Sequence, residues 1–121
     1  MFPIQVARVY GLPPNKGPEG RVLVDRLWPR GVTKASLDLD AWAKNAAPST
    51  GLRKWYAHDP ERFEEFSGLY LAELALEPAA SAVAELRAMA RERKLVLLTA
   101  TRDLERSHAT ILRSAVADVA L

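Results

Sequence analysis

Cysteine is absent from this sequence of 121 residues, of which 49% are hydrophobic. The absence excludes a thiol nucleophile, a zinc site with cysteine ligands and a disulfide framework. No apolar run approaches the roughly 20 residues that a membrane-spanning helix needs, and the first residues lack the pattern of a signal peptide. We therefore expect a cytoplasmic protein without membrane contact, folded as one domain over residues 1–121.

Histidine is also rare, with two residues, and the formal net charge is only +2. The basic residues are unevenly distributed, because residues 1–34 contain six basic and two acidic side chains. This local bias suits a small anionic ligand better than a nucleic acid, which requires a larger basic surface. Glutamates within residues 60–93 would repel nucleic-acid phosphates if that segment formed a helix-turn-helix. Nucleic-acid binding is therefore the least favoured function.

Hydrophobic patterns predict strands and helices that alternate along the chain. Residues 4–10 alternate apolar and polar side chains as a half-buried strand does, and residues 21–27 contain a short apolar run. Residues 95–100 include four consecutive apolar residues, which indicates a strand buried on both faces, as in a parallel sheet. Helical spacing follows Pro78 and recurs over residues 104–116. We predict an α/β fold, a small layered sheet that is at least partly parallel with helices packed on its faces.

Between these elements, the sequence predicts a loop and several short helices. Residues 11–20 are rich in proline and glycine and are typical of a surface loop. Apolar residues within 37–46 are spaced to share a helical face. Ser49 or Thr50 suits the N-cap of a short helix, and Asp59 before a proline suits another.

Polar side chains follow two of the predicted strands. Ligands in open α/β sheets bind beyond the carboxyl ends of the strands, so strands 21–27 and 95–100 would direct their polar ends into one crevice. A helix N-terminus after residue 103 would add backbone N–H groups that favour an anion. We therefore predict a site for an anionic small molecule. The candidate ligand-binding residues are Arg21, Asp25, Arg26, Trp28, Arg30, Thr101, Arg102 and Asp103.

The residues of this crevice allow two interpretations. Arg26 and Arg30 can offer paired N–H donors to a phosphate or carboxylate. Alternatively, they form ion pairs with Asp25 and Asp103, and the network serves only the fold. Asp25 is favoured as a group that orients an arginine over a general base, because neighbouring guanidiniums lower the pKa of a carboxylate. Trp28 is favoured as a core residue over a stacking platform.

Any catalysis would use His58, His108 or Asp103, which are the catalytic candidates. Their spacing contains no His-x-x-x-His pair, so we expect no metal, and no motif predicts a cofactor. No Gly-x-Ser-x-Gly motif surrounds a serine, and residues 17–20 lack the ending of a P-loop. Enzymatic activity and oligomeric state stay open, and the alternative function is a non-catalytic binding or regulatory module.

Several motifs together resemble a known family. Asp-Arg-Leu-Trp-Pro-Arg-Gly at residues 25–31, His-Asp-Pro-Glu-Arg at 58–62 and Leu-Leu-Thr-Ala-Thr-Arg-Asp at 97–103 are similar to signatures of the YeaO-like family, in the superfamily of domain of unknown function 488. The resemblance covers nearly the whole chain and implies a small bacterial cytoplasmic protein with an α/β fold. The family usually has Asn-His-Ala where this chain has Ser-His-Ala at 107–109, so a hydroxyl replaces an amide. The family implies no agreed role for the matching polar positions, which are Arg21, Asp25, Arg26, Arg30, His58, Arg102, Asp103 and His108.

Overall fold

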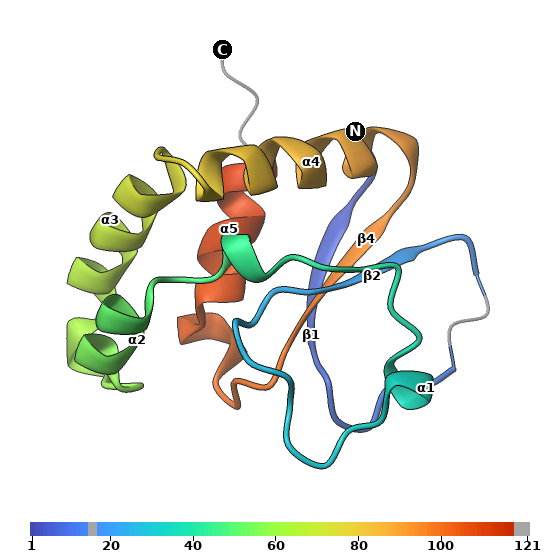
Figure 1. Cartoon of the computed structure of the whole chain (residues 1–121), viewed down its shortest axis with the longest axis horizontal. Helices are drawn as coiled ribbons and strands as arrows, with labels where there is room; N and C mark the ends of the chain where they lie inside the picture. The colour runs from blue at the N-terminus through green and yellow to red at the C-terminus, as the bar shows by residue number, and fades with distance from the viewer. Residues whose placement is uncertain (15–16, 118–121) are drawn as a thin grey trace.

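The computed structural model describes residues 1–14 and 17–117 and has a parallel sheet at its centre (Figure 1). The strands within this part of the chain are β1 (Ile4–Arg8), β2 (Gly20–Leu23), β3 (Ala41–Trp42) and β4 (Leu95–Thr99). They lie in the order β1-β4-β2-β3, and each neighbouring pair is parallel. The predicted α/β fold with parallel strands is therefore confirmed.

The longer helices cover one face of the sheet, as Figure 1 shows for α3, α4 and α5. These helices are α2 (Thr50–Tyr56), α3 (Phe63–Leu74), α4 (Ala79–Glu92) and α5 (His108–Ala117). The short helix α1 (Lys34–Leu37) and neighbouring loops pack on the other face. None of the helices within residues 1–14 and 17–117 is long and apolar enough to span a bilayer.

The central strand β4 explains why both faces must be covered. All five of its residues are buried, as the apolar run predicts for a strand between two layers. Successive side chains of a strand point to opposite faces. Leu95 and Leu97 accordingly pack against the longer helices, whereas Val96 and Leu98 pack on the side of α1. The carboxyl end of β4 is thus held between two hydrophobic cores.

The strands predicted over residues 4–10 and 95–100 end at Arg8 and Thr99, and two other predicted elements differ more from the structure. The strand predicted over residues 21–27 ends at Leu23, although the N–H of Val24 still donates to Leu98 O at 3.0 Å. The helix predicted from residue 104 is divided into a 3-10 turn, Leu104–Arg106, and α5. The polar residues that follow β2 and β4 therefore lie in loops at the ends of these strands.

The helical face predicted within residues 37–46 is wrong. Asp38 adopts a left-handed conformation with φ of 49° and ends α1 after one turn. The carboxylate of Asp40 then accepts a hydrogen bond from the N–H of Arg21 at 2.8 Å, and the next two residues pair with β2 as β3. Apolar spacing misled here because a strand of two residues shows no alternation of its own.

Both predicted helix caps are confirmed. The hydroxyl of Ser49 accepts a hydrogen bond from Leu52 N at 3.2 Å at the start of α2. The carboxylate of Asp59 accepts one from Glu61 N at 3.0 Å, ahead of a 3-10 turn that leads into α3. The predicted loop over residues 11–20 lies between β1 and β2, and its residues 15–16 are outside the described part of the chain.

Tyr70 of α3 is fully buried, and its hydroxyl donates to the carbonyl of Ala46. Burial raises the pKa of Tyr70, so the hydroxyl stays protonated as a donor. We expect Tyr70→Phe to lower the free energy of unfolding by about 1–2 kcal/mol, because the buried carbonyl loses its partner. Urea unfolding measures this. The control is Tyr10→Phe, since Tyr10 is exposed and donates to Arg30 O; an equal loss in the control would contradict the role of burial.

Candidate functional site

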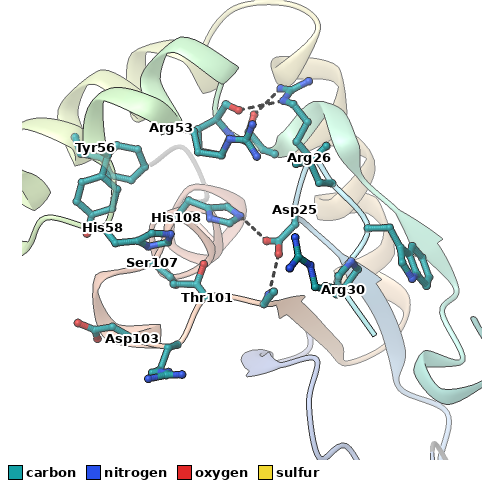
Figure 2. Close-up of a pocket in the computed structure, with 18 of the residues that line it drawn as sticks. Asp25, Arg26, Arg30, Arg53, Tyr56, His58, Thr101, Asp103, Ser107 and His108 are labelled. Carbon is teal, nitrogen blue, oxygen red and sulfur yellow. Dashed lines mark hydrogen bonds and ion pairs between the residues drawn. The ribbon is translucent and has the colours of Figure 1, made fainter. Parts of the chain in front are cut away.

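The polar residues that follow β2 and β4 surround a cavity of about 480 Å³ (Figure 2). The cavity lies beyond the carboxyl ends of these two parallel strands, at the place where open α/β sheets bind their ligands. The convergence of the two strand ends that the sequence predicts is therefore present. The cavity is lined by residues 25–30, 47–48, 100–103 and 107–108, and by Tyr10, Arg53, Tyr56, His58 and Phe66.

Asp25 is the most extensively bonded side chain of the cavity. Its Oδ1 accepts a hydrogen bond from Thr99 Oγ1 at 2.7 Å, and its Oδ2 accepts one from Ala100 N at 2.8 Å. Burial alone would raise the pKa of this carboxyl, but the hydrogen bond and charge of His108, with the donors from Ala100 and Thr99, outweigh it and hold the pKa below its ordinary value. Asp25 is therefore an anion that ties β2 to the end of β4.

His108, the first residue of α5, is the side-chain partner of Asp25. Its Nε2 lies 3.2 Å from Asp25 Oδ1 and 3.0 Å from Val24 O. Both oxygens are acceptors, so Nε2 carries a proton. The His108 ring also lies edge-on to the ring of Tyr70, with centroids 6.1 Å apart. The prediction that Asp25 orients an arginine is corrected here, because Asp25 orients a histidine.

The arginines of the cavity fall into two groups. Arg26 donates from Nε to Pro48 O at 3.2 Å and from Nη2 to Ala47 O at 3.1 Å, so it fixes the segment before α2. The other arginines that line the cavity have no carboxylate partner within the described residues, and they are Arg30, Arg53 and Arg102. The cavity thus has an excess of positive charge.

The sequence offers ion pairs of Arg26 and Arg30 with the aspartates as the alternative interpretation, and the described residues contain none. Asp25 pairs with His108, and Asp103 pairs with Arg106 at 3.1 Å. Asp103 and Arg106 are each about half exposed, with 48% and 51% of the side chain accessible, so this pair stabilises little. The four arginines of the cavity lining outnumber its two aspartates, so a net positive charge is left.

Arg21 is not among the residues that line the cavity. Its side chain is 4% exposed and lies on the opposite side of β2, where Nη1 donates to Leu37 O at 3.0 Å and Nη2 donates to Pro13 O. Trp28 does line the cavity, but its indole also packs with the core beside α1, and its Nε1 donates to Val32 O at 2.7 Å. Both residues have clear structural roles.

The three catalytic candidates all line the cavity but do not form one catalytic arrangement. His108 is bound to Asp25, Asp103 is bound to Arg106, and the exposed His58 has a ring contact with Tyr56 at 6.3 Å between centroids. The Ser107 hydroxyl donates to a backbone carbonyl at 2.8 Å. In the part of the chain that the structure describes, no three His, Asp or Glu side chains are placed to hold a metal ion.

Helix α2 contributes two cavity residues that the sequence did not single out, Arg53 and Tyr56. The start of this helix is fixed against α3, because Glu73 accepts hydrogen bonds from the N–H of Ser49 at 2.8 Å and from its hydroxyl at 2.6 Å. The ring of Tyr56 stacks on Phe66 with centroids 4.1 Å apart. The spacing of Ser49 and Arg53, one helical turn apart, is the only local signal for this placement.

Comparisons with known proteins identify relatives over most of the chain. A family model described as "Inactive DUF488-N3 subclade" matches residues 3–120. The uncharacterized protein Rv3073c of Mycobacterium tuberculosis is 46% identical over 110 residues, which cover 90% of this chain and 89% of the relative. The uncharacterized protein YeaO of Escherichia coli is 40% identical over 110 residues, which cover 90% and 92% of the two chains. No solved structure matches this chain.

Proposed function

This chain belongs to the DUF488-N3 family, in the subclade described as inactive, and we propose that it binds a small organic anion without transforming it chemically. The observation that carries the proposal is the set of three arginines, Arg30, Arg53 and Arg102, that line one cavity without carboxylate partners among the described residues. Guanidinium groups bind phosphates and carboxylates through charge-assisted hydrogen bonds. The ligand would be an anionic metabolite of the cytoplasm, the compartment that the sequence predicts.

The start of α5 supports the same ligand charge. This helix of 10 residues begins at His108, which lines the cavity. Backbone N–H groups in the first turn of a helix have no partners within the helix and carry partial positive charge. An anion in the cavity would therefore meet a positive helix end as well as guanidinium groups.

The bonding of Asp25 and of His108 Nε2 argues against either as a general base, and Nδ1 of His108 is the ring nitrogen that these contacts leave open to that role. A general base needs a free lone pair near the proton that it removes. Both oxygens of Asp25 accept hydrogen bonds, and Nε2 of His108 is directed at Asp25 and Val24 O. This pair joins the start of α5 to the end of β2, which is a structural task. The description of the subclade as inactive agrees with such a role.

The proposal predicts that anions stabilise the protein through these arginines. We expect phosphate or sulfate to raise the melting temperature of the wild type, and Arg30→Ala and Arg102→Ala, each made alone, to weaken the affinity at least tenfold. Loss of one charge-assisted hydrogen bond costs about 1.5–3 kcal/mol, and 1.4 kcal/mol is a factor of ten in affinity. Titration calorimetry and thermal unfolding, both at constant ionic strength, measure the two effects.

The matched control is Arg91→Ala, because Arg91 is exposed on α4 and does not line the cavity. The control removes the same charge, so it reproduces any general effect of net charge on anion binding. Equal weakening in the control, or a wild-type protein that no anion stabilises, would contradict the proposed function.

A further inference from the structure

The cavity is much larger than an inorganic anion. Its volume is about 480 Å³. It falls in the range of about 300–1,000 Å³ that encloses organic ligands. A phosphate or sulfate ion would occupy one part of the cavity and leave the rest to solvent. The anionic group therefore fits better as one end of a larger molecule.

The two ends of the cavity differ in chemistry. In Figure 2, Arg30 lies beside Asp25 at one end, and Tyr56 and His58 lie at the other. The Tyr56 ring is held in place by its stack on Phe66 and by a hydrogen bond from its hydroxyl to a backbone carbonyl at 2.6 Å. Tyr56 is only 6% exposed, so the exposed ring of His58 is the planar surface that this end offers to a ligand. One end thus suits an anion and the other suits a ring.

The backbone at His58 is a second observation at the aromatic end. His58 has a φ of 57°, directly after Ala57 with a φ of 47°. Ala57 is the C-cap of α2, where a left-handed residue is common. His58 lies beyond the helix, where a left-handed residue other than glycine is uncommon. Unfavourable backbone conformations occur preferentially at ligand sites, and this one accompanies a ring at the cavity wall.

We propose that the cavity binds a phosphate monoester that carries a planar ring and has the size of a nucleoside monophosphate. The phosphate lies at the end of Arg30, and the ring lies against the exposed ring of His58. The inference rests on the proposed function and adds the ring to it. A sugar phosphate would satisfy the cationic end equally well, but it would leave the aromatic end unused. The ring therefore distinguishes this ligand class from other phosphate esters.

The test compares ligands that carry the ring and the phosphate separately and together. Titration calorimetry of the wild type uses AMP, UMP, ribose 5-phosphate, adenosine and inorganic phosphate at constant ionic strength. We expect AMP or UMP to bind at least tenfold more tightly than ribose 5-phosphate, since stacking of a base on aromatic side chains contributes that much. We also expect adenosine to bind more weakly than either nucleotide, because it lacks the anion.

The outcomes separate this inference from the proposed function. If ribose 5-phosphate or phosphate binds and neither nucleotide binds more tightly, the proposal that the ligand carries a ring is overturned. The proposed anion site stands in that case. If no phosphate compound binds, this inference fails, and the proposed function fails as well only if no other anion stabilises the wild type. Tight binding of adenosine that equals the binding of AMP would overturn the placement of the phosphate at the arginines.

Two glycine substitutions locate the ring. Glycine adopts the left-handed conformation without strain, so His58→Gly and Ala57→Gly should both fold, with melting temperatures equal to or a few degrees above that of the wild type. We expect His58→Gly to weaken nucleotide binding about fivefold through the lost ring contact and to leave ribose 5-phosphate unchanged. Ala57→Gly, outside the cavity lining, should change neither affinity. Equal effects of the two variants, or equal effects on the two ligands, would overturn the contact with His58.

Discussion

Replacement of Asp25 by alanine is expected to lower the free energy of unfolding by about 3 kcal/mol or more. The side chains of Asp25 and His108 are only 16% and 12% exposed, and each hydrogen bond to a charged group contributes about 1.5–3 kcal/mol. The substitution also leaves the N–H of Ala100 and the hydroxyl of Thr99 without their acceptor. Urea unfolding at pH 7 measures the loss.

The same carboxylate makes stability depend on pH in a defined direction. The pKa of Asp25 in the folded protein lies below its ordinary value of 3.8, so the folded state favours the ionised form. Its contribution to stability is complete above that value and is lost as the pH falls through 3.8 toward the lower pKa of the folded state. We therefore expect the difference in stability between the wild type and Asp25→Asn to narrow below about pH 4.

Two results would contradict this role of Asp25. A difference between the wild type and Asp25→Asn that stays constant from pH 6 to pH 3 would show that the charge of the carboxylate is not what stabilises the fold. A loss below about 1 kcal/mol in Asp25→Ala would show that the pair with His108 is loosely held. The control is Asp103→Ala, because Asp103 pairs with the half-exposed Arg106. We expect this control to lower the free energy of unfolding by no more than about 1 kcal/mol.

The place of the cavity could be predicted from the sequence because the two strands that end at it appear as continuous apolar runs. The run at residues 95–100 indicates a central strand, and parallel strands place their carboxyl ends together. The residues after both strands, such as Arg30 and Arg102, therefore had to lie near one another, as they do. The direction of the strands alone brings these residues together, and sequence periodicity with the alternation of strands and helices predicts that direction.

The partners of individual side chains could not be predicted in the same way. His108 is 84 residues from Val24, which it contacts, and the acceptors of Arg26 are backbone carbonyls that carry no sequence signal. The position of Arg53 depends on the angle at which α2 packs on α3. Such contacts arise from the packing of whole elements, so residue spacing alone predicts the neighbourhood of a side chain and not its hydrogen bonds.

Arg21→Ala is the second substitution with a large expected effect, about 3 kcal/mol in the free energy of unfolding. The buried guanidinium donates to Leu37 O and Pro13 O, and hydrogen bonds from charged donors contribute about 1.5–3 kcal/mol each. Leu37 ends the one-turn helix α1, and Pro13 belongs to the loop between β1 and β2. Both segments lack a large core of their own, so the arginine is expected to hold them against the sheet.

Arg21→Lys separates the planar geometry of the guanidinium group from its charge. Lysine keeps the charge but lacks the planar arrangement of donors that reaches two carbonyls at once, so we expect it to recover less than half of the loss. Arg30→Ala is the opposite control, because this exposed arginine should change stability by no more than about 0.5 kcal/mol while it weakens anion binding. If Arg21→Ala left stability unchanged, or Arg30→Ala lowered it as strongly, the division between an arginine that serves the fold and arginines that serve the cavity would be wrong.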